Sequence, residues 1–232
     1  MLAKKITGGL AAAAAIALLP AAHAENLILN GDFSSGTFAN WTTYATAGGG
    51  LSWSATKDPI GVVDFDVDGD GNLSQAGRFR PGQVGTYQSG LWAGGGITQS
   101  FASDAGAFSL DMDLAFYRDS SATSSGTSGG RYQIFLDGTL LGTWSLASVS
   151  TGATVRNSFS YDGTLTAGTH ELKIEMTRQY LTGSTPATST PFQFVDNVVL
   201  DAPAAPVPEA SQLAMLLTGL GLIAGVTRRR LR

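Results

Sequence analysis

The stretch Phe108-Ser-Leu-Asp-Met-Asp-Leu-Ala-Phe116 decides the fold class of this chain. Apolar residues occupy every second position from Phe108 to Phe116, and Ser109, Asp111 and Asp113 stand between them. Because successive side chains of a β-strand point to opposite faces of its sheet, this pattern predicts a strand that buries one face and exposes the other. A helix would repeat its apolar residues every three to four positions instead.

Similar short segments recur along the chain. Residues 132–144 are predicted to form a hairpin, because Asp137-Gly138 separates two strand-like runs and favours a tight turn. Polar, low-complexity stretches at 119–130 and 181–190 are expected to be loops. Many short strands with almost no amphipathic helix predict an all-β fold, an antiparallel β-sandwich. Further strands are expected at 96–101, 155–161, 170–176 and 192–200.

The composition of the central part restricts its partners and chemistry. Residues 25–201 are predicted to form one domain, since a chain of this length can bury a substantial core. Residues 25–206 contain eight Lys and Arg against 17 Asp and Glu, a net charge of −9. Such acidity argues against nucleic acid as a partner, because nucleic-acid binding needs a basic face. The absence of cysteine from the whole chain excludes disulfides, thiol nucleophiles and thiolate metal sites.

The N-terminus has the three-part layout of a secretory signal peptide. Lys4 and Lys5 supply its positive region, residues 6–22 are uncharged, and Ala22-His23-Ala24 has the small-residue pattern that precedes a cleavage point. A core helix would carry a polar face, which this segment lacks. We expect residues 1–24 to be removed during export, so that the mature chain begins at Glu25.

The C-terminus is equally distinct from the domain. Residues 202–206 are predicted to be a Pro/Ala spacer, and a glycine-containing apolar stretch at 213–226 is predicted to be a short hydrophobic helix. The cluster Arg228-Arg229-Arg230 follows that stretch. Arginines directly after an apolar helix are retained on the cytoplasmic side, so the domain before the helix is expected to face outward.

The motif Val207-Pro208-Glu209-Ala210-Ser211 immediately precedes this apolar stretch. The order of a Pro-Glu motif, a short apolar helix and terminal arginines resembles a PEP-CTERM protein-sorting signal over residues 207–232. The resemblance implies that an exosortase, a membrane-embedded processing enzyme, recognises Pro208, Glu209 and the arginine cluster. It also implies anchoring in the inner membrane before processing. The mature protein would then reside at the cell surface or in the extracellular matrix of a Gram-negative bacterium.

Two further motifs stand at the ends of the domain. The chain opens with Asn26-Leu-Ile-Leu-Asn-Gly-Asp-Phe33 and Asn40-Trp41-Thr42, and closes with Phe194-Val-Asp-Asn-Val-Val-Leu200. Together these motifs resemble the jelly-roll carbohydrate-binding-module superfamily. The resemblance implies that the first and last strands lie side by side, joined by a structural calcium ion near Asp32 and Asp196. From the residues alone, both aspartates could equally be turn and edge residues that cap backbone N–H groups.

A second acidic group could also hold calcium. Asp66, Asp68, Asp70 and Gly71 match the start of a calcium loop, in which alternate carboxylates and a glycine turn converge on one ion. The twelfth position is Gly77 instead of the bidentate glutamate, and no helix is predicted beside the loop, which argues against an EF-hand. The residues therefore predict either a weak extracellular calcium site or a solvated acidic turn. Calcium is the one cofactor expected.

Several aromatic residues lie among glycine and polar residues, a composition typical of a surface that binds sugar. An aromatic ring can stack on the apolar face of a sugar ring while polar neighbours bind its hydroxyl groups. Each of these side chains could instead belong to the core, as we expect for Trp41 and Trp144. The candidate glycan-binding residues are Trp53, Tyr87, Trp92 and Tyr117.

Catalysis has little support in the sequence. His170 is the only histidine expected in the mature chain, and no G-x-S-x-G motif accompanies it. Asp111 and Asp113 could act as a glycosidase pair, but solvated carboxylates are expected on the polar face of a strand in any case. The preferred hypothesis is a non-catalytic glycan-binding module associated with exopolysaccharide, as in a biofilm. A structural matrix or adhesion protein without a defined glycan ligand is the alternative, and a glycoside hydrolase is a third.

Overall fold

The computed structural model describes residues 24–52, 59–122, 128–182 and 190–204. Within these ranges the chain forms strands and no helix, so the all-β prediction is confirmed for this part. The strands are β1 (Ala24–Asn26), β2 (Thr42–Ala45), β3 (Gly49–Gly50), β4 (Gly61–Phe65), β5 (Ser74–Phe79), β6 (Gly82–Gln83), β7 (Ala93–Ser103), β8 (Gly106–Tyr117), β9 (Gly130–Leu136), β10 (Thr139–Leu146), β11 (Thr154–Leu165), β12 (Gly168–Arg178) and β13 (Phe192–Pro203).

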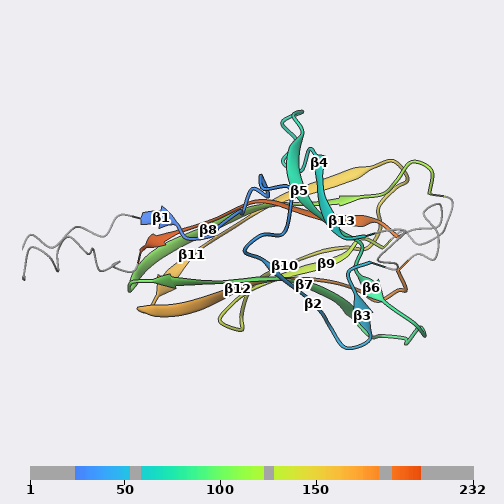
Figure 1. Cartoon of the computed structure of the whole chain (residues 1–232). Coiled ribbons are helices and arrows are strands. Elements are labelled where there is room, and N and C mark those ends of the chain that lie inside the picture. Colours follow the sequence, from blue (N-terminus) through green and yellow to red (C-terminus); the bar gives the residue numbers. More distant parts are fainter. Residues whose placement is uncertain (1–23, 53–58, 123–127, 183–189, 205–232) are drawn as a thin grey trace, which may run out of the picture.

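Two antiparallel sheets face each other (Figure 1). The six-stranded sheet has the order β11-β8-β13-β5-β4, and β1 also pairs with β13. The five-stranded sheet has the order β10-β9-β12-β7-β2, and β3 pairs with β6 in a small separate ladder. The predicted antiparallel β-sandwich is therefore confirmed, including the pairing of the first strand with the last.

The chain crosses between the two sheets as in a jelly roll. The steps β7 to β8, β8 to β9, β10 to β11, β11 to β12 and β12 to β13 each cross from one sheet to the other, and β9–β10 forms a hairpin within one sheet. That hairpin turns at Asp137-Gly138, as predicted. Alternate crossing places each apolar strand face against the opposite sheet, where it is removed from water.

The core lies between the sheets and follows the predicted alternation. Phe108, Leu110, Met112, Leu114 and Phe116 of β8 are all at most 5% exposed. They form one cluster with inward residues of the opposite sheet, which include Ile97, Tyr132, Ile134, Leu172, Ile174 and Met176. Trp41 is buried in this cluster and Trp144 packs against it, so the core assignment of both tryptophans is confirmed.

The opening and closing motifs hold the N-terminal segment against the last strand. Asn26 accepts a hydrogen bond from the backbone N–H of Leu200 through its side-chain oxygen, over 3.1 Å. The carbonyl oxygen of Gly31 accepts one from the N–H of Val198, over 3.0 Å. A Cβ atom at Gly31 would lie 1.9 Å from the carbonyl oxygen of Val198, so only glycine permits this approach. These motif residues therefore have a structural role in the described part of the chain.

The sandwich has two unlike ends. At one end, which we call the terminal end, lie β1, the last residues of β13, and the turns that join β7 to β8 and β11 to β12. At the other, the loop end, lie residues 80–92, 118–122, 128–129, 147–153, 179–182 and 190–191, which belong to the connections between strands. Figure 1 shows β1 at the left and these connections at the right.

The predicted export and sorting segments lie largely outside the described residues. This holds for residues 1–23 of the signal peptide and for Pro208, Glu209 and the cluster Arg228-Arg229-Arg230. Strand β13 runs to Pro203 with Ala202 buried, and Ala204 bridges to Ser103, so the sheet extends into the segment predicted to be a spacer. In the ranges that the structure describes, no helix is long and apolar enough to cross a membrane.

Candidate glycan-binding face

The outer face of the five-stranded sheet carries a group of aromatic and charged side chains. In β9 and β12 the inward positions are occupied by Tyr132, Ile134, Leu172 and Ile174, so the residues between them point outward. Strand β2 adds one ring, and the residue before β7 adds another. We call this group the aromatic face; it consists of Tyr44, Trp92, Arg131, Gln133, Phe135, Lys173 and Glu175.

Trp92 and Arg131 pack against each other at the loop end of the aromatic face. The guanidinium carbon of Arg131 lies 4.4 Å from the centroid of the Trp92 ring, within the range of a cation–π contact. Its Nε donates to the hydroxyl of Thr177 over 2.9 Å. Burial lowers the pKa of Arg131, while the nearby Glu175 raises it. These contacts hold the indole and guanidinium planes together in a fixed, half-buried position.

A second cluster lies further along the same face. The hydroxyl of Tyr44 donates to Oε2 of Glu175 over 3.1 Å, and burial together with Glu175 raises the pKa of Tyr44. Nζ of Lys173 lies 3.6 Å from the same Glu175 oxygen and 4.0 Å from the centroid of the Phe135 ring. Gly96 pairs with Tyr44, and a Cβ atom there would lie 2.8 Å from the Tyr44 ring. The tyrosine therefore lies directly on the backbone of β7.

Two exposed tyrosines extend this aromatic surface at the loop end. The rings of Tyr87 and Tyr180 are nearly parallel, at 13°, with centroids 6.3 Å apart, and the residues are 46% and 51% exposed. The buried side chain of Gln83 fixes both loops: its Nε2 contacts the carbonyl oxygens of Gln88, Leu91 and Gln179 at 2.7–2.9 Å. We call Tyr87 and Tyr180 the tyrosine pair. The hydrogen bonds of Gln83 thus hold both loops in place, and the position of the loops does not depend on packing between the two exposed rings.

The structure separates the four aromatic residues that were predicted to bind glycan. Tyr87 belongs to the tyrosine pair and Trp92 to the aromatic face. Tyr117 lies on the other sheet, where its ring packs against Phe65 with centroids 5.5 Å apart. Trp53 lies outside the described residues.

Most of the aromatic face was not predicted from the sequence. The missed residues are Tyr44, Arg131, Gln133, Phe135, Lys173, Glu175 and, in the tyrosine pair, Tyr180. A signal was available, because Gln133 and Phe135 alternate with apolar residues in the strand predicted from Tyr132, and Arg131 directly precedes it. The outward positions of two strands that are neighbours in one sheet form a common surface, but the alternation does not reveal which strands are neighbours.

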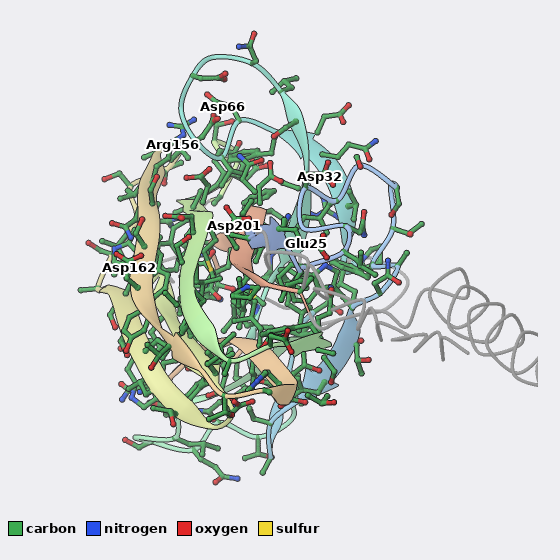
Figure 2. The ribbon with its side chains drawn as sticks, turned by 90° about the vertical axis from the view of Figure 1, so that its left-hand side faces the viewer. Glu25, Asp32, Asp66, Arg156, Asp162 and Asp201 are labelled. Atoms are coloured by element: carbon green, nitrogen blue, oxygen red, sulfur yellow. The ribbon has the colours of Figure 1, made fainter. Side chains whose placement is uncertain are left out.

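The acidic loop between β4 and β5 gathers three carboxylates. Asp66, Asp68 and Asp70 each place an oxygen within 4.8 Å of the others. Asp66 also accepts from the guanidinium of Arg156 over 3.0 Å, and Figure 2 shows these two side chains close together beside the loop. Asp70 accepts from the backbone and side chain of Asn72, and these hydrogen bonds lower its pKa. The donor set fits a hard cation, although Arg156 already neutralises one of its three charges.

Asp196 does not lie at the edge of its sheet. It is fully buried in β13, which has β8 and β5 on either side, so the edge interpretation is wrong. One carboxylate oxygen accepts from the Ser74 hydroxyl over 2.5 Å and the other from the N–H of Asn197 over 2.8 Å. Burial, together with the negative charges of Asp113 and Asp32, raises the pKa of Asp196 to about 6, although the hydrogen bonds from Ser74 and Asn197 act in the opposite direction.

The surroundings of Asp196 fit a cation better than those of Asp32 do. A divalent ion beside Asp196 would offset the repulsion from Asp113, its partner on β8. Asp32 accepts from the backbone N–H and the hydroxyl of Ser34 through one oxygen, as a turn residue does. Its other oxygen makes no hydrogen bond within the described residues and could serve as a ligand.

The groups considered for catalysis are engaged in structural contacts. Nδ1 of His170 lies 2.6 Å from a carboxylate oxygen of Asp137, and its Nε2 lies 3.0 Å from the carbonyl oxygen of Thr166. Asp111 and Asp113 accept from serine hydroxyls of the neighbouring strand β11, on the outer face of the six-stranded sheet. Neither arrangement pairs a nucleophile with a free general base.

Comparisons with known proteins give likenesses of structure alone. No family model matches the chain, and no curated protein matches it. The structure of TmCBM61 in complex with β-1,4-galactotriose is 11% identical, with a TM-score of 0.44, over 76% of this chain and 97% of that one. The CBM22-1 xylan-binding domain from Paenibacillus barcinonensis Xyn10C is 12% identical, with a TM-score of 0.40, over 80% of this chain and 99% of that one.

A third solved structure comes from a different kind of protein. The K1 cleaved adhesin domain of Lys-gingipain from Porphyromonas gingivalis W83 is 11% identical, with a TM-score of 0.37, over 79% of this chain and 98% of that one. At these identities and scores, the function has to be argued from the residues of this chain. What the residues provide is an antiparallel β-sandwich with an aromatic face on one sheet and a tyrosine pair beside it.

Proposed function

We propose that the domain is a non-catalytic module that binds a polysaccharide chain on the aromatic face and the tyrosine pair. The main support for this proposal is the arrangement of aromatic rings and polar groups on the outer face of one sheet. Trp92 with Arg131, and Phe135 with Lys173, each combine an aromatic ring with a cation. Rings offer apolar area to the faces of sugars, and the charged groups beside them can bind hydroxyl groups.

The rigidity of this surface supports the same function. Binding a flexible polymer costs conformational entropy, and side chains that are already ordered reduce that cost. Glu175 is bonded to Tyr44 and lies beside Lys173, and Gln83 fixes the loops of the tyrosine pair. The surface therefore needs little rearrangement before it can bind.

Affinity electrophoresis of the exported chain in gels that contain soluble polysaccharides tests this function. We expect retardation by at least one neutral polysaccharide, and we expect Trp92→Ala to weaken binding about tenfold, the effect of losing ~1.4 kcal/mol. Leu73→Ala is the matched control, since this leucine is 70% exposed on the acidic loop, away from the aromatic face. Equal retardation of both variants, or no retardation by any polysaccharide, would contradict the proposal.

A structural or adhesive role is the second candidate, and one observation favours it. The outer face of the six-stranded sheet carries Ser158 and Ser160 of β11, which donate to Asp113 and Asp111 of β8. This hydroxyl-rich and acidic surface lacks the ring-and-cation pairs of the aromatic face. If no glycan binds, this surface is where contacts with other matrix components should be sought.

We further propose that the chain is exported and sorted through its C-terminal signal. The support is the order of Pro208, Glu209, the apolar stretch and the arginine cluster 228–230. A strain that lacks the exosortase should accumulate the uncleaved protein in its membrane fraction, seen as a larger band by immunoblotting. Processing that is unchanged in such a strain would leave the tail as an ordinary membrane anchor.

Calcium is proposed as a structural ion, with Asp32 and Asp196 as one ligand set and Asp66, Asp68 and Asp70 as another. Their clustered negative charge supports this proposal. Millimolar calcium should raise the melting temperature of the exported chain, and magnesium should do so less. Asp68→Asn and Asp32→Asn would assign the effect to one set, and an unchanged melting temperature would remove both.

A further inference from the structure

A cavity of about 400 Å³ opens between the edges of the two sheets, away from the aromatic face. Its walls come from β10, the edge strand of one sheet, and β11, the edge strand of the other. It lies toward the terminal end, beside the Asp137-Gly138 turn and the turn that joins β11 to β12. The pairing of β10 with β9 shifts register between Leu140 and Gly142, and Leu141 at this bulge lines the cavity.

One side of the cavity is apolar and ends in an accessible ring. Phe108 and Leu136 form its inner part, and both are at most 6% exposed. Tyr161 lies beside Phe108, with ring centroids 6.0 Å apart and the rings tilted by 30°. It is 37% exposed, so part of its ring is open to a ligand.

The other side is polar and is ordered by an ion pair. Nδ1 of His170 lies 2.6 Å from Oδ2 of Asp137, while Oδ1 of Asp137 accepts from the N–H of Glu171 over 2.9 Å. Burial opposes the charging of His170, but the hydrogen bonds to Asp137 and to the carbonyl of Thr166 raise its pKa above the ordinary value. The pair therefore ties together the two turns that border the cavity.

These contacts determine which polar groups a ligand can use. Both ring nitrogens of His170 are engaged, so the imidazolium offers no free donor. The side chain of Asp137 is 47% exposed, and each of its oxygens has a second lone pair. The cavity is also lined by Thr139 and Thr164, whose side chains can both donate and accept.

We propose that this cavity binds one neutral sugar unit, as a site separate from the aromatic face. Tyr161 offers an apolar ring surface, and Asp137 and the threonines offer partners for hydroxyl groups. A carboxylate-bearing ligand would be repelled by Asp137, because the charge of His170 is already paired. A purely apolar ligand would leave Asp137 and the threonine hydroxyls without water or partners. The volume lies near the lower end of the range of small-molecule sites, about 300–1,000 Å³, and suits a single unit or a chain end.

Nuclear magnetic resonance of the full exported chain tests this site directly. Backbone amide signals are followed while glucose, galactose, mannose or xylose is added, each in a separate titration. We expect one of them to shift, in a saturable way, the signals of Gly163 and Thr164, which line the cavity, and of Glu171, whose N–H binds Asp137. Tyr161→Ala should weaken this binding about tenfold, and Tyr180→Ala, which removes an equally exposed tyrosine from the tyrosine pair, should leave it unchanged.

Three results would overturn the proposal: no shift of these signals by any of the four sugars, an equal shift by glucuronate, or unchanged binding in Tyr161→Ala. If Tyr161→Ala does not fold, Thr164→Val replaces it, because this change removes one hydroxyl and keeps the shape of the side chain. The proposal that the aromatic face binds polysaccharide is tested separately from this site. Tyr161→Ala should leave retardation by polysaccharide intact, whereas Trp92→Ala should weaken retardation and leave the sugar-induced shifts unchanged.

Discussion

Asp196 should make the metal-free protein more stable in mild acid than at neutral pH. Its folded-state pKa is about 6, against an ordinary value of 3.8, because burial and the charges of Asp113 and Asp32 disfavour the carboxylate. A group whose pKa rises on folding contributes stability below its unfolded pKa, and that contribution is lost as the pH rises through the folded pKa. The full contribution of this pKa difference to the unfolding free energy is about 3 kcal/mol. The contribution falls by about 1.4 kcal/mol between pH 5 and pH 7.5.

Urea unfolding in the presence of EDTA measures this effect. His170 has a raised pKa as well and also favours lower pH, so the wild-type difference alone does not isolate Asp196. We therefore compare wild type with Asp196→Asn, which cannot take up a proton at this position. The gain in unfolding free energy between pH 7.5 and pH 5 should be about 1.4 kcal/mol smaller in Asp196→Asn.

Calcium adds a second criterion to the same experiment. An ion bound to the Asp196 carboxylate stabilises its charged form, so calcium should raise stability at pH 7.5 more than at pH 5. An identical pH dependence in wild type and Asp196→Asn would refute the assignment of the pKa to this residue. If the difference in stability between pH 7.5 and pH 5 is the same with and without calcium, Asp196 is not a calcium ligand. The assignment of the pKa to Asp196 would not be affected by that result.

Three further changes test the structural contacts. Tyr132→Phe removes a buried hydroxyl that lies 2.8 Å and 2.9 Å from two carbonyl oxygens of the opposite sheet, and should lower the unfolding free energy by about 1–3 kcal/mol in urea. Gly31→Ala should lower the melting temperature markedly, since its Cβ would overlap the carbonyl of Val198; an unchanged value would disprove that approach. His170→Gln should flatten the stability profile between pH 6 and 8, because the contribution of its ion pair with Asp137 is lost as the pH rises through the raised pKa; the wild-type slope in this variant would assign the titration elsewhere.

The fold could be predicted because strand alternation is a local property. The segment from Phe108 to Phe116 specifies its buried face through its own residues, and β8 follows that pattern. The Asp137-Gly138 turn likewise requires only neighbouring residues. These features depend on residues a few positions apart, and a single sequence displays them directly.

The candidate site could be predicted only in part, because its contacts join distant segments. Tyr44 and Glu175 are separated by 131 positions, and they meet only because β2, β7 and β12 are neighbours in one sheet. Sequence order does not give strand order, so composition selected Tyr87 and Trp92 but also Tyr117, which lies on the other sheet. Asp196 stands in the closing motif that the sequence displays, but its burial depends on β5 and β8, which lie on the two sides of β13.

The distribution of charge gives the domain two different outer faces. The aromatic face contains Arg131 and Lys173, and Lys173 lies 3.6 Å from Glu175. On the outer side of the six-stranded sheet lie Asp111, Asp113 and the acidic loop 66–70, with Arg156 among them. The carboxylates of Asp111, Asp113 and the acidic loop therefore lie away from the aromatic face. A polysaccharide that binds the aromatic face as proposed would not meet these carboxylates, and the calcium ion proposed above could bind them without competing for the same surface.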